Sequence, residues 1–157
     1  MGRTTALRAA LKQSLFPVLE RRGFVIDKSG QPLFTTFRRR VGDDVHVIDL
    51  QWDKYGRPNF VLNFGKAPAQ GIVRQGQPVP ADKAEVFDCQ PRLRLQRARG
   101  RTTASWYRLR RPWLEQIVRW SRDRNPDEVV GDVVAHLQEV EAWYRDGIEG
   151  PHVKRMG

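Results

Sequence analysis

The spacing of apolar side chains divides the chain into a helical start, an alternating middle and a helical end. Near the N-terminus, Leu7, Leu11 and Leu15 recur at intervals of four residues, which places them on one face of a helix. Gly23 follows this run, and glycine commonly ends a helix because it adopts left-handed backbone angles at little steric cost. We therefore predict an N-terminal helix that buries its leucines and ends at Gly23.

The middle of the chain changes to a period of two, which is typical of strands with one buried face. The alternating segments are residues 33–40, 45–52, 59–65, 85–96 and 104–111. Turns that contain Gly or Pro separate most of them, so we predict a mainly antiparallel sheet of four or five strands. Residues 66–84 contain Pro and Gly with little periodicity, and we predict a long loop there.

Two helices are predicted after the sheet. Pro112 is well placed as the first residue of the earlier helix, because proline fits the first turn. The apolar face of this helix is formed by Trp113, Leu114, Ile117, Val118 and Trp120. The later helix begins with the cap Asn125 and the first-turn Pro126, carries a valine-rich stripe and ends at Gly147.

Together these elements predict a single α+β domain over residues 1–157, with the N-terminal helix and the two C-terminal helices packed on one face of the sheet. The length of 157 residues and the hydrophobic content of 39% suffice to bury a core. The predicted ordered core covers residues 4–147, and residues 148–157 are predicted to form a frayed tail.

The formal net charge of +10 is concentrated in one segment. Residues 89–114 contain no Asp or Glu. The arginines of this segment are Arg92, Arg94, Arg97, Arg99, Arg101, Arg108, Arg110 and Arg111. Outside it, the remaining 20 of the 28 basic residues face 18 acidic ones, so the surplus there is only two. A genome-wide preference for arginine would spread the charge, whereas this excess is local.

Cysteine content and hydropathy bear on the cellular location. The one cysteine, Cys89, excludes an internal disulfide and is typical of a reducing compartment. The N-terminal residues lack the uninterrupted apolar run of a signal peptide, and no stretch approaches the roughly 18 apolar residues of a membrane span. We therefore expect a cytoplasmic protein with no membrane partner, and the oligomeric state stays open.

Several segments carry a resemblance to a known family. They are LKQSLFPVLERRGF, VHVIDLQW, NFVLNFG, VFDCQPRLR and ASWYRL, followed by the helix that ends in WYRDG. These segments resemble the bacterial family named domain of unknown function 4304, and the similarity covers residues 6–147. The resemblance implies the α+β fold. The family has no established activity, so the resemblance implies no catalytic residue.

Candidate metal-binding and nucleophilic residues are few. Asp132, His136 and Glu139 share one face of the last predicted helix, but that face lies opposite the apolar stripe, where polar rows are typical of solvated surface. We predict no metal site and no cofactor, because metal sites need three or four convergent ligands. Cys89 has the inward parity of Phe87 and is predicted to be a buried, unreactive thiol.

The strand residues leave two alternatives that involve a pocket. An enzyme would need His46 and Asp49 to converge with a third group, either Cys89 or Asp88. The strand pattern disfavours this arrangement, because Asp49 lies on the opposite strand face from His46. Polar residues on one predicted sheet face could instead line a small-molecule site, although a solvated outer face is the simpler interpretation; they are Asp49, Gln51 and Asn63.

The arginine segment is the strongest candidate for a functional site. We predict that residues 85–96 and 104–111 form a hairpin with arginines on its outer face. The predicted contact residues are Arg92, Arg94, Arg97, Arg99, Arg101, Arg108, Arg110 and Trp106. Arginines at alternate positions of a strand stand about 6.6 Å apart, and guanidinium groups bind phosphates through paired hydrogen bonds. Trp106 and Tyr107 offer an aromatic surface on which bases could stack if one of the two is exposed.

We therefore expect a non-catalytic domain that binds a negatively charged partner through this hairpin, with nucleic acid as the leading candidate. A second interpretation is an acidic protein partner, as for immunity proteins that neutralise toxins. A third is that the arginines only keep an exposed strand from pairing with other chains. An enzyme with a polar site on the sheet face is the remaining alternative.

Overall fold

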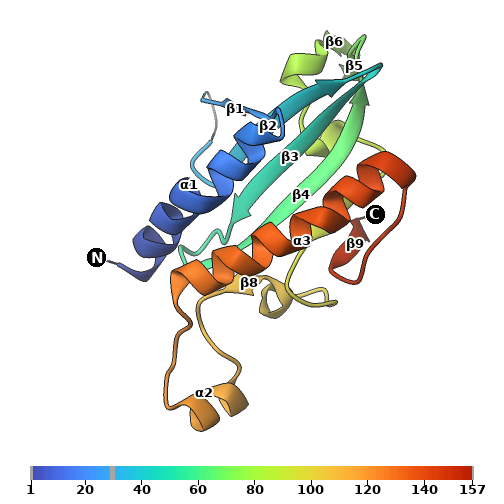
Figure 1. Ribbon diagram of the computed structural model, residues 1–157. Coiled ribbons are helices and arrows are strands. Elements are labelled where there is room, and N and C mark those ends of the chain that lie inside the picture. Colours follow the sequence, from blue (N-terminus) through green and yellow to red (C-terminus); the bar gives the residue numbers. More distant parts are fainter. Residues whose placement is uncertain (1, 29–30, 157) are drawn as a thin grey trace.

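An antiparallel sheet with two long helices on one face forms the body of the protein (Figure 1). The computed structural model describes residues 2–28 and 31–156. The helices are α1 (Arg3–Arg21), α2 (Trp113–Arg119) and α3 (Pro126–Asp146). The strands are β1 (Val25–Asp27), β2 (Phe34–Val41), β3 (Asp44–Trp52), β4 (Asn59–Pro68), β5 (Ile72–Arg74), β6 (Gln77–Val79), β7 (Arg92–Leu95), β8 (Tyr107–Arg108) and β9 (Val153–Met156). The predicted α+β architecture, with one N-terminal and two C-terminal helices, is confirmed.

Seven of the strands in the described part of the chain form one sheet. Its order is β1-β2-β3-β4-β7-β9, and β8 pairs with β4 beside β7. All of these pairs are antiparallel. The sheet is wider than four or five strands because β1 and β9 have only three and four residues, too few for a period of two to be recognised. None of the described helices has the length and hydropathy needed to cross a membrane.

Alternation along β3 and β4 directs one set of apolar side chains toward α1 and α3. Ile48 pairs with Phe64 and Leu50 pairs with Leu62, and all four side chains are buried. The leucines of α1 and the valines of α3 complete this main core. Figure 1 shows the two helices side by side across this face, and they contact each other.

The last helix is fixed at both ends by polar contacts. At its start, the side chain of Asn125 accepts a hydrogen bond from the Asp127 backbone N–H at 2.9 Å, as expected of a helix cap. Near its end, the buried hydroxyl of Tyr144 donates to the carbonyl oxygen of Val47 at 2.9 Å. The Tyr144 ring also stacks on His46, with ring centroids 3.9 Å apart. The two contacts of Tyr144 attach α3 to β3.

A second, smaller apolar cluster lies on the opposite face of the sheet. Val45 and Val47 of β3 pack there with Ala84 and Cys89.

The prediction of an unstructured loop over residues 66–84 is wrong in part, because β4 extends into this segment and β5 and β6 form a hairpin within it. β5 and β6 have only three residues each, which are too few for alternation to be recognised in the sequence.

The C-terminal segment is ordered, which corrects the predicted fraying of residues 148–157. β9 pairs with all four residues of β7, and Val153 is buried. The His152 backbone N–H donates to Glu139 Oε1 at 2.7 Å. Gly157 lies outside the described residues. The prediction failed because the stability of β9 depends on its pairing with β7, which is distant in the sequence. Its four residues alone show too little of a pattern to predict a strand.

The helix α2 does not pack on the sheet, contrary to the prediction. It stands at the end of residues 111–122, here called the α2 arm, which extends away from the sheet and α3 (Figure 1). Backbone hydrogen bonds close the base of the arm, from Arg111 N to Arg122 O at 2.9 Å and from Arg124 N to Leu109 O at 2.8 Å. Its large apolar side chains are exposed; they are Trp113, Leu114, Ile117, Val118 and Trp120. The sheet face that they would have covered is already occupied by α1 and α3.

Candidate functional site

The arginine segment lies along one edge of β4. β7 pairs with residues 62–64 of β4, and β8 pairs with residues 59–60. The two strands follow one another along this edge and do not pair with each other, so the predicted hairpin is wrong. The other edge of β7 is occupied by β9. Alternation identifies strands and their faces but not their partners, which is why the error arose.

Arg92, Arg94 and Arg108 share one face of the sheet and are called here the arginine row. Because the residues next to them in β7 and β8 are buried under the helices, these three side chains project from the opposite face. Arg94 pairs with Asn63 of β4. Arg108 pairs with Asn59, so the backbones of Arg94 and Arg108 stand about 13 Å apart along the strand. The row follows β4 on the face that α1 and α3 leave free.

Arg94 is held in place by polar side chains of the central strands. Its Nε donates to Asn63 Oδ1 at 2.7 Å, and its Nη2 donates to Gln51 Oε1 at 3.2 Å. Its guanidinium lies over the Trp106 ring, 5.4 Å from the centroid. Burial lowers the pKa of Arg94, and the neighbouring Arg92 lowers it further. Gln51 and Asn63 therefore orient an arginine, and with it they line a cavity of about 200 Å³.

The prediction of a stacking surface at Trp106 is wrong. This side chain is only 8% exposed, and Arg94 lies over its ring. The tryptophans that do reach solvent are Trp113 and Trp120 of the α2 arm, which are 69% and 93% exposed. The sequence pattern predicts that both tryptophans lie on a helix face that packs on the core, because apolar residues at helical spacing usually do so.

Six arginines surround a cavity of about 300 Å³ at the base of the α2 arm, called here the arginine cup. They are Arg97, Arg108, Arg110, Arg111, Arg119 and Arg124, and Glu115 and Glu128 also line the cavity. In the described part of the chain, the buried Nε atoms of Arg97, Arg108 and Arg111 have no hydrogen-bond acceptor. Burial lowers the pKa of Arg108, and the charges of Arg97 and Arg110 lower it further. An anion in this cavity would face several guanidinium groups, whose exposed N–H groups could donate to it.

Within the described residues, the arginines of the arginine segment form no ion pair with a carboxylate. Among residues 2–28 and 31–156, no carboxylate lies within 4.0 Å of a side-chain nitrogen of the eight arginines in residues 89–114. Arginines elsewhere do have such partners, for example Arg38 with Asp27 and Arg39 with Glu141, each at 2.7 Å. Within the described residues, the acidic residues of α3 form no ion pair with the eight arginines, although Glu128 lines the arginine cup beside some of them. The segment therefore presents positive charge that is not held in ion pairs.

The cationic surface continues to the tip of the loop between β7 and β8. Arg99 and Arg101 are exposed there. The Arg99 Nε donates to the Pro151 carbonyl at 3.4 Å, a long hydrogen bond that leaves most of the guanidinium free. Together with Lys154 and Arg155, these arginines line a cavity of about 530 Å³. The tip therefore joins the basic residues of β9.

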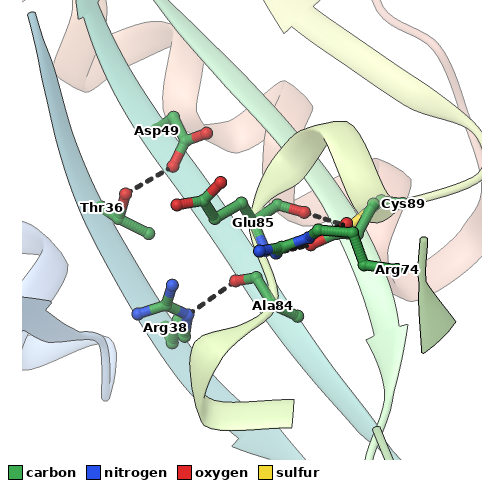
Figure 2. A network of polar contacts seen from close by, with 8 residues as sticks. Thr36, Arg38, Asp49, Arg74, Ala84, Glu85 and Cys89 are labelled. Atoms are coloured by element: carbon green, nitrogen blue, oxygen red, sulfur yellow. Dashed lines mark hydrogen bonds and ion pairs between the residues drawn. The ribbon is translucent and has the colours of Figure 1, made fainter. Parts of the chain in front are cut away.

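A polar network beside the arginine row includes Asp49, Glu85 and Arg38 (Figure 2). The Thr36 hydroxyl donates to Asp49 Oδ1 at 2.8 Å. Burial raises the pKa of Asp49 to about 6, and the charge of Glu85 adds to the rise. Figure 2 shows the carboxylates of Asp49 and Glu85 directed into the same space, while Arg38 donates to the carbonyl of Ala84 at 2.8 Å. Asp49 is thus a buried acid without a direct arginine partner in this network.

The raised pKa of Asp49 predicts that stability falls as the pH rises. The folded protein holds the Asp49 proton more tightly than the unfolded chain, in which Asp titrates near pH 3.9, so the charged form is penalised above about pH 6. Between pH 4 and 7, wild type should lose about 2 kcal/mol relative to Asp49→Asn. Urea unfolding at both pH values measures this difference. Asp43→Asn, at an exposed turn, controls for the loss of a charge, and a pH-independent difference would contradict the prediction.

The groups that an enzyme would need do not converge. His46 stacks on Tyr144 on the helix-covered face, and burial lowers its pKa to about 4. Cys89 packs on the other face, where burial raises its pKa to about 12. Asp88 is held in an ion pair with Arg74. The sheet separates His46 from the other candidates, so this constellation is not assembled.

The polar face of α3 contributes to a different group of potential metal ligands from Asp132, His136 and Glu139, which the sequence pattern places together. Asp132 pairs with Arg124 at 2.8 Å. His136 and Glu139 instead meet His152 from the C-terminal segment, for which the sequence predicts a frayed tail. Within the described residues, these three side chains form the one group of His, Cys, Asp and Glu that could hold a metal ion.

Comparison with known proteins supports the fold and leaves the activity open. No curated protein and no solved structure matches the chain. The family model described as "Domain of unknown function (DUF4304)" matches residues 15–146, which include β1 to β8 and end with the last residue of α3. His152 and β9 lie beyond the matched region. Because the match covers most of its length, the chain belongs to the DUF4304 family.

Proposed function

We propose that this protein is a non-catalytic domain that binds nucleic acid through the arginine row, the arginine cup and the exposed Arg99 and Arg101 at the tip of the loop between β7 and β8. One observation carries the proposal. In the part of the chain that the structure describes, eight neighbouring arginines have no carboxylate partner, and four of them have buried Nε atoms without acceptors. A phosphate supplies the negative charge that these groups lack, and its oxygens can accept from the exposed N–H groups of the guanidiniums.

The arrangement of the arginines suits a single strand. Arg92 and Arg94 stand about 6.6 Å apart along β7, a spacing that an extended phosphate backbone can follow. The arginine cup continues the positive surface to the α2 arm. There, Trp113 and Trp120 expose aromatic faces on which unpaired bases stack. Stacking depends little on sequence, so we expect weak base preference.

Replacing three exposed arginines tests the proposal. The variant Arg99→Gln, Arg101→Gln, Arg110→Gln should bind a labelled single-stranded oligonucleotide at least about ten-fold more weakly than wild type, because fewer phosphates are neutralised and fewer counterions are released on binding. The slope of log affinity against log salt should fall by about one for each arginine–phosphate pair that the substitutions remove. Fluorescence anisotropy between 50 and 200 mM salt, about the range in which such pairs are screened, measures both.

A matched variant removes the same charge from other exposed positions: Arg21→Gln, Arg40→Gln, Arg145→Gln. It should keep the affinity and slope of wild type within about two-fold, because long-range charge alone is screened at these salt concentrations. Equal weakening of both variants would show attraction by net charge only. Absence of binding by wild type at low salt would refute the proposal.

An acidic protein is the second candidate partner, and one observation favours it. The α2 arm exposes the aliphatic side chains of Leu114, Ile117 and Val118, which nucleic acid would leave in water. A protein groove lined by apolar residues and edged by carboxylates would bury this face. The variant Ile117→Ser, Val118→Ser separates the two partners. It should leave oligonucleotide affinity unchanged but abolish co-purification of a stoichiometric acidic protein.

A further inference from the structure

Three side chains that can ligate metal join α3 to the C-terminal segment. His136 and Glu139 stand three residues apart on α3 and so share a face of the helix. His152 lies between α3 and β9, and its imidazole stacks on that of His136 with centroids 3.6 Å apart and an angle of 16°. One ligand atom from each residue lies within 4.8 Å of those of the other two.

Each imidazole is already oriented by a hydrogen bond to one of its nitrogens. The Tyr107 hydroxyl meets His136 Nδ1 at 2.7 Å, which leaves Nε2 of that ring available. Glu139 accepts from the His152 backbone N–H at 2.7 Å and contacts His152 Nδ1 at 2.6 Å. Metal-binding histidines characteristically have such partners, because the partners fix the orientation and tautomer of the ring.

We propose that His136, Glu139 and His152 bind a divalent transition-metal ion, with water completing the coordination. Two imidazoles and one carboxylate are a ligand set that zinc accepts. Tetrahedral zinc, with bonds of about 2.0–2.1 Å, places its ligand atoms about 3.3–3.4 Å apart. Because an imidazole lone pair lies in the plane of its ring, at least one of the two stacked rings must rotate out of the stack for both to coordinate one ion.

The ion would also stabilise the loop that carries the arginine tip. The Gln96 backbone N–H donates to the His152 carbonyl at 3.0 Å, just before this loop. Lys154 Nζ donates to the Gly100 carbonyl at 3.0 Å within it. Fixing His152 to α3 therefore holds the segment on which the loop rests. The metal proposal stands apart from nucleic-acid binding, since it concerns the ion alone.

Titration calorimetry of the full, tag-free chain with zinc chloride, and with cobalt chloride in parallel, tests the site. We expect one ion per chain and a higher melting temperature with zinc, and no response to magnesium, which prefers oxygen ligands. Glu139→Gln should weaken zinc binding at least about ten-fold and remove the increase in melting temperature. The glutamine can still accept the His152 backbone hydrogen bond, so the variant should fold. His136→Gln provides a second, independent loss of a ligand.

A protein that binds neither zinc nor cobalt would overturn the proposal. Unchanged zinc affinity in both variants would also overturn it, because the ion would then be bound elsewhere. Melting curves of the metal-free variants exclude unfolding as the cause of a loss. A lower melting temperature without any dependence on metal would assign the three residues a purely structural role and refute the site.

Discussion

Removing residues 151–157 is expected to lower the free energy of unfolding by about 3–5 kcal/mol. The deletion takes away β9, so one edge of β7 loses its partner and Val153 no longer covers the core. It also removes His152, whose backbone and ring both bind Glu139. Burial of one valine contributes about 1.5–3 kcal/mol, and each hydrogen bond adds about 0.5–1.5 kcal/mol net.

Urea unfolding followed by tryptophan fluorescence measures this loss. The substitution Arg155→Ala, at an exposed position of the same strand, serves as the control. It should change stability by about 0.5 kcal/mol or less, because its side chain lies at the surface. An unchanged unfolding midpoint in the truncated protein would mean that β9 contributes nothing to the fold.

Gly65→Val is expected to destabilise the protein by more than about 3 kcal/mol, although valine normally favours a strand. A Cβ atom at Gly65 would lie 2.5 Å from the Cβ of Cys89 and 3.3 Å from the carbonyl oxygen of Pro91. The first distance is far below van der Waals contact, so the segment that covers this face of the sheet must move. Urea unfolding measures the change in stability.

A second substitution shows whether this close approach is the cause. Cys89→Gly removes the atoms that the new side chain would meet first. The double variant should be about 1–2 kcal/mol more stable than the two single changes predict when added, because neighbours that clash are not independent. Strict additivity would place the cost of Gly65→Val elsewhere. A stabilising effect of Gly65→Val alone would refute the argument outright.

The main core could be predicted from the sequence because the apolar positions of each strand and helix show which of its faces is buried. Ile48, Leu50 and Trp52 alternate with polar residues in one continuous strand, and a strand with one buried face must alternate in this way. The start and the end of α3 could also be predicted from the sequence. Asn125 caps it, and Gly147 ends it with a φ of 72°.

Strand partners could not be predicted, because pairing is decided by the whole sheet. Nothing in β7 or β8 shows that both lie along one edge of β4, or that β9 occupies the other edge of β7. The four residues of β9 are also too few to establish a period. The predicted hairpin and the predicted frayed tail are the two errors that followed.

The candidate site was predicted in part, for the same reason. Local alternation was enough to place Arg92 and Arg94 away from the main core. The contributions of Arg119 and Arg124 to the arginine cup depend on the path of the α2 arm, which no local pattern specifies. His152 joins α3 only because β9 brings it there.

The late position of β9 has a consequence for synthesis of the chain. β7 is made roughly 60 residues before the strand that completes it. Since domains begin to fold as they are translated, α1 and the central strands can assemble while one edge of β7 is still open. An open edge invites pairing with other chains. The sheet is therefore completed only when residues 153–156 have been added, and chains that terminate before them would keep an aggregation-prone edge.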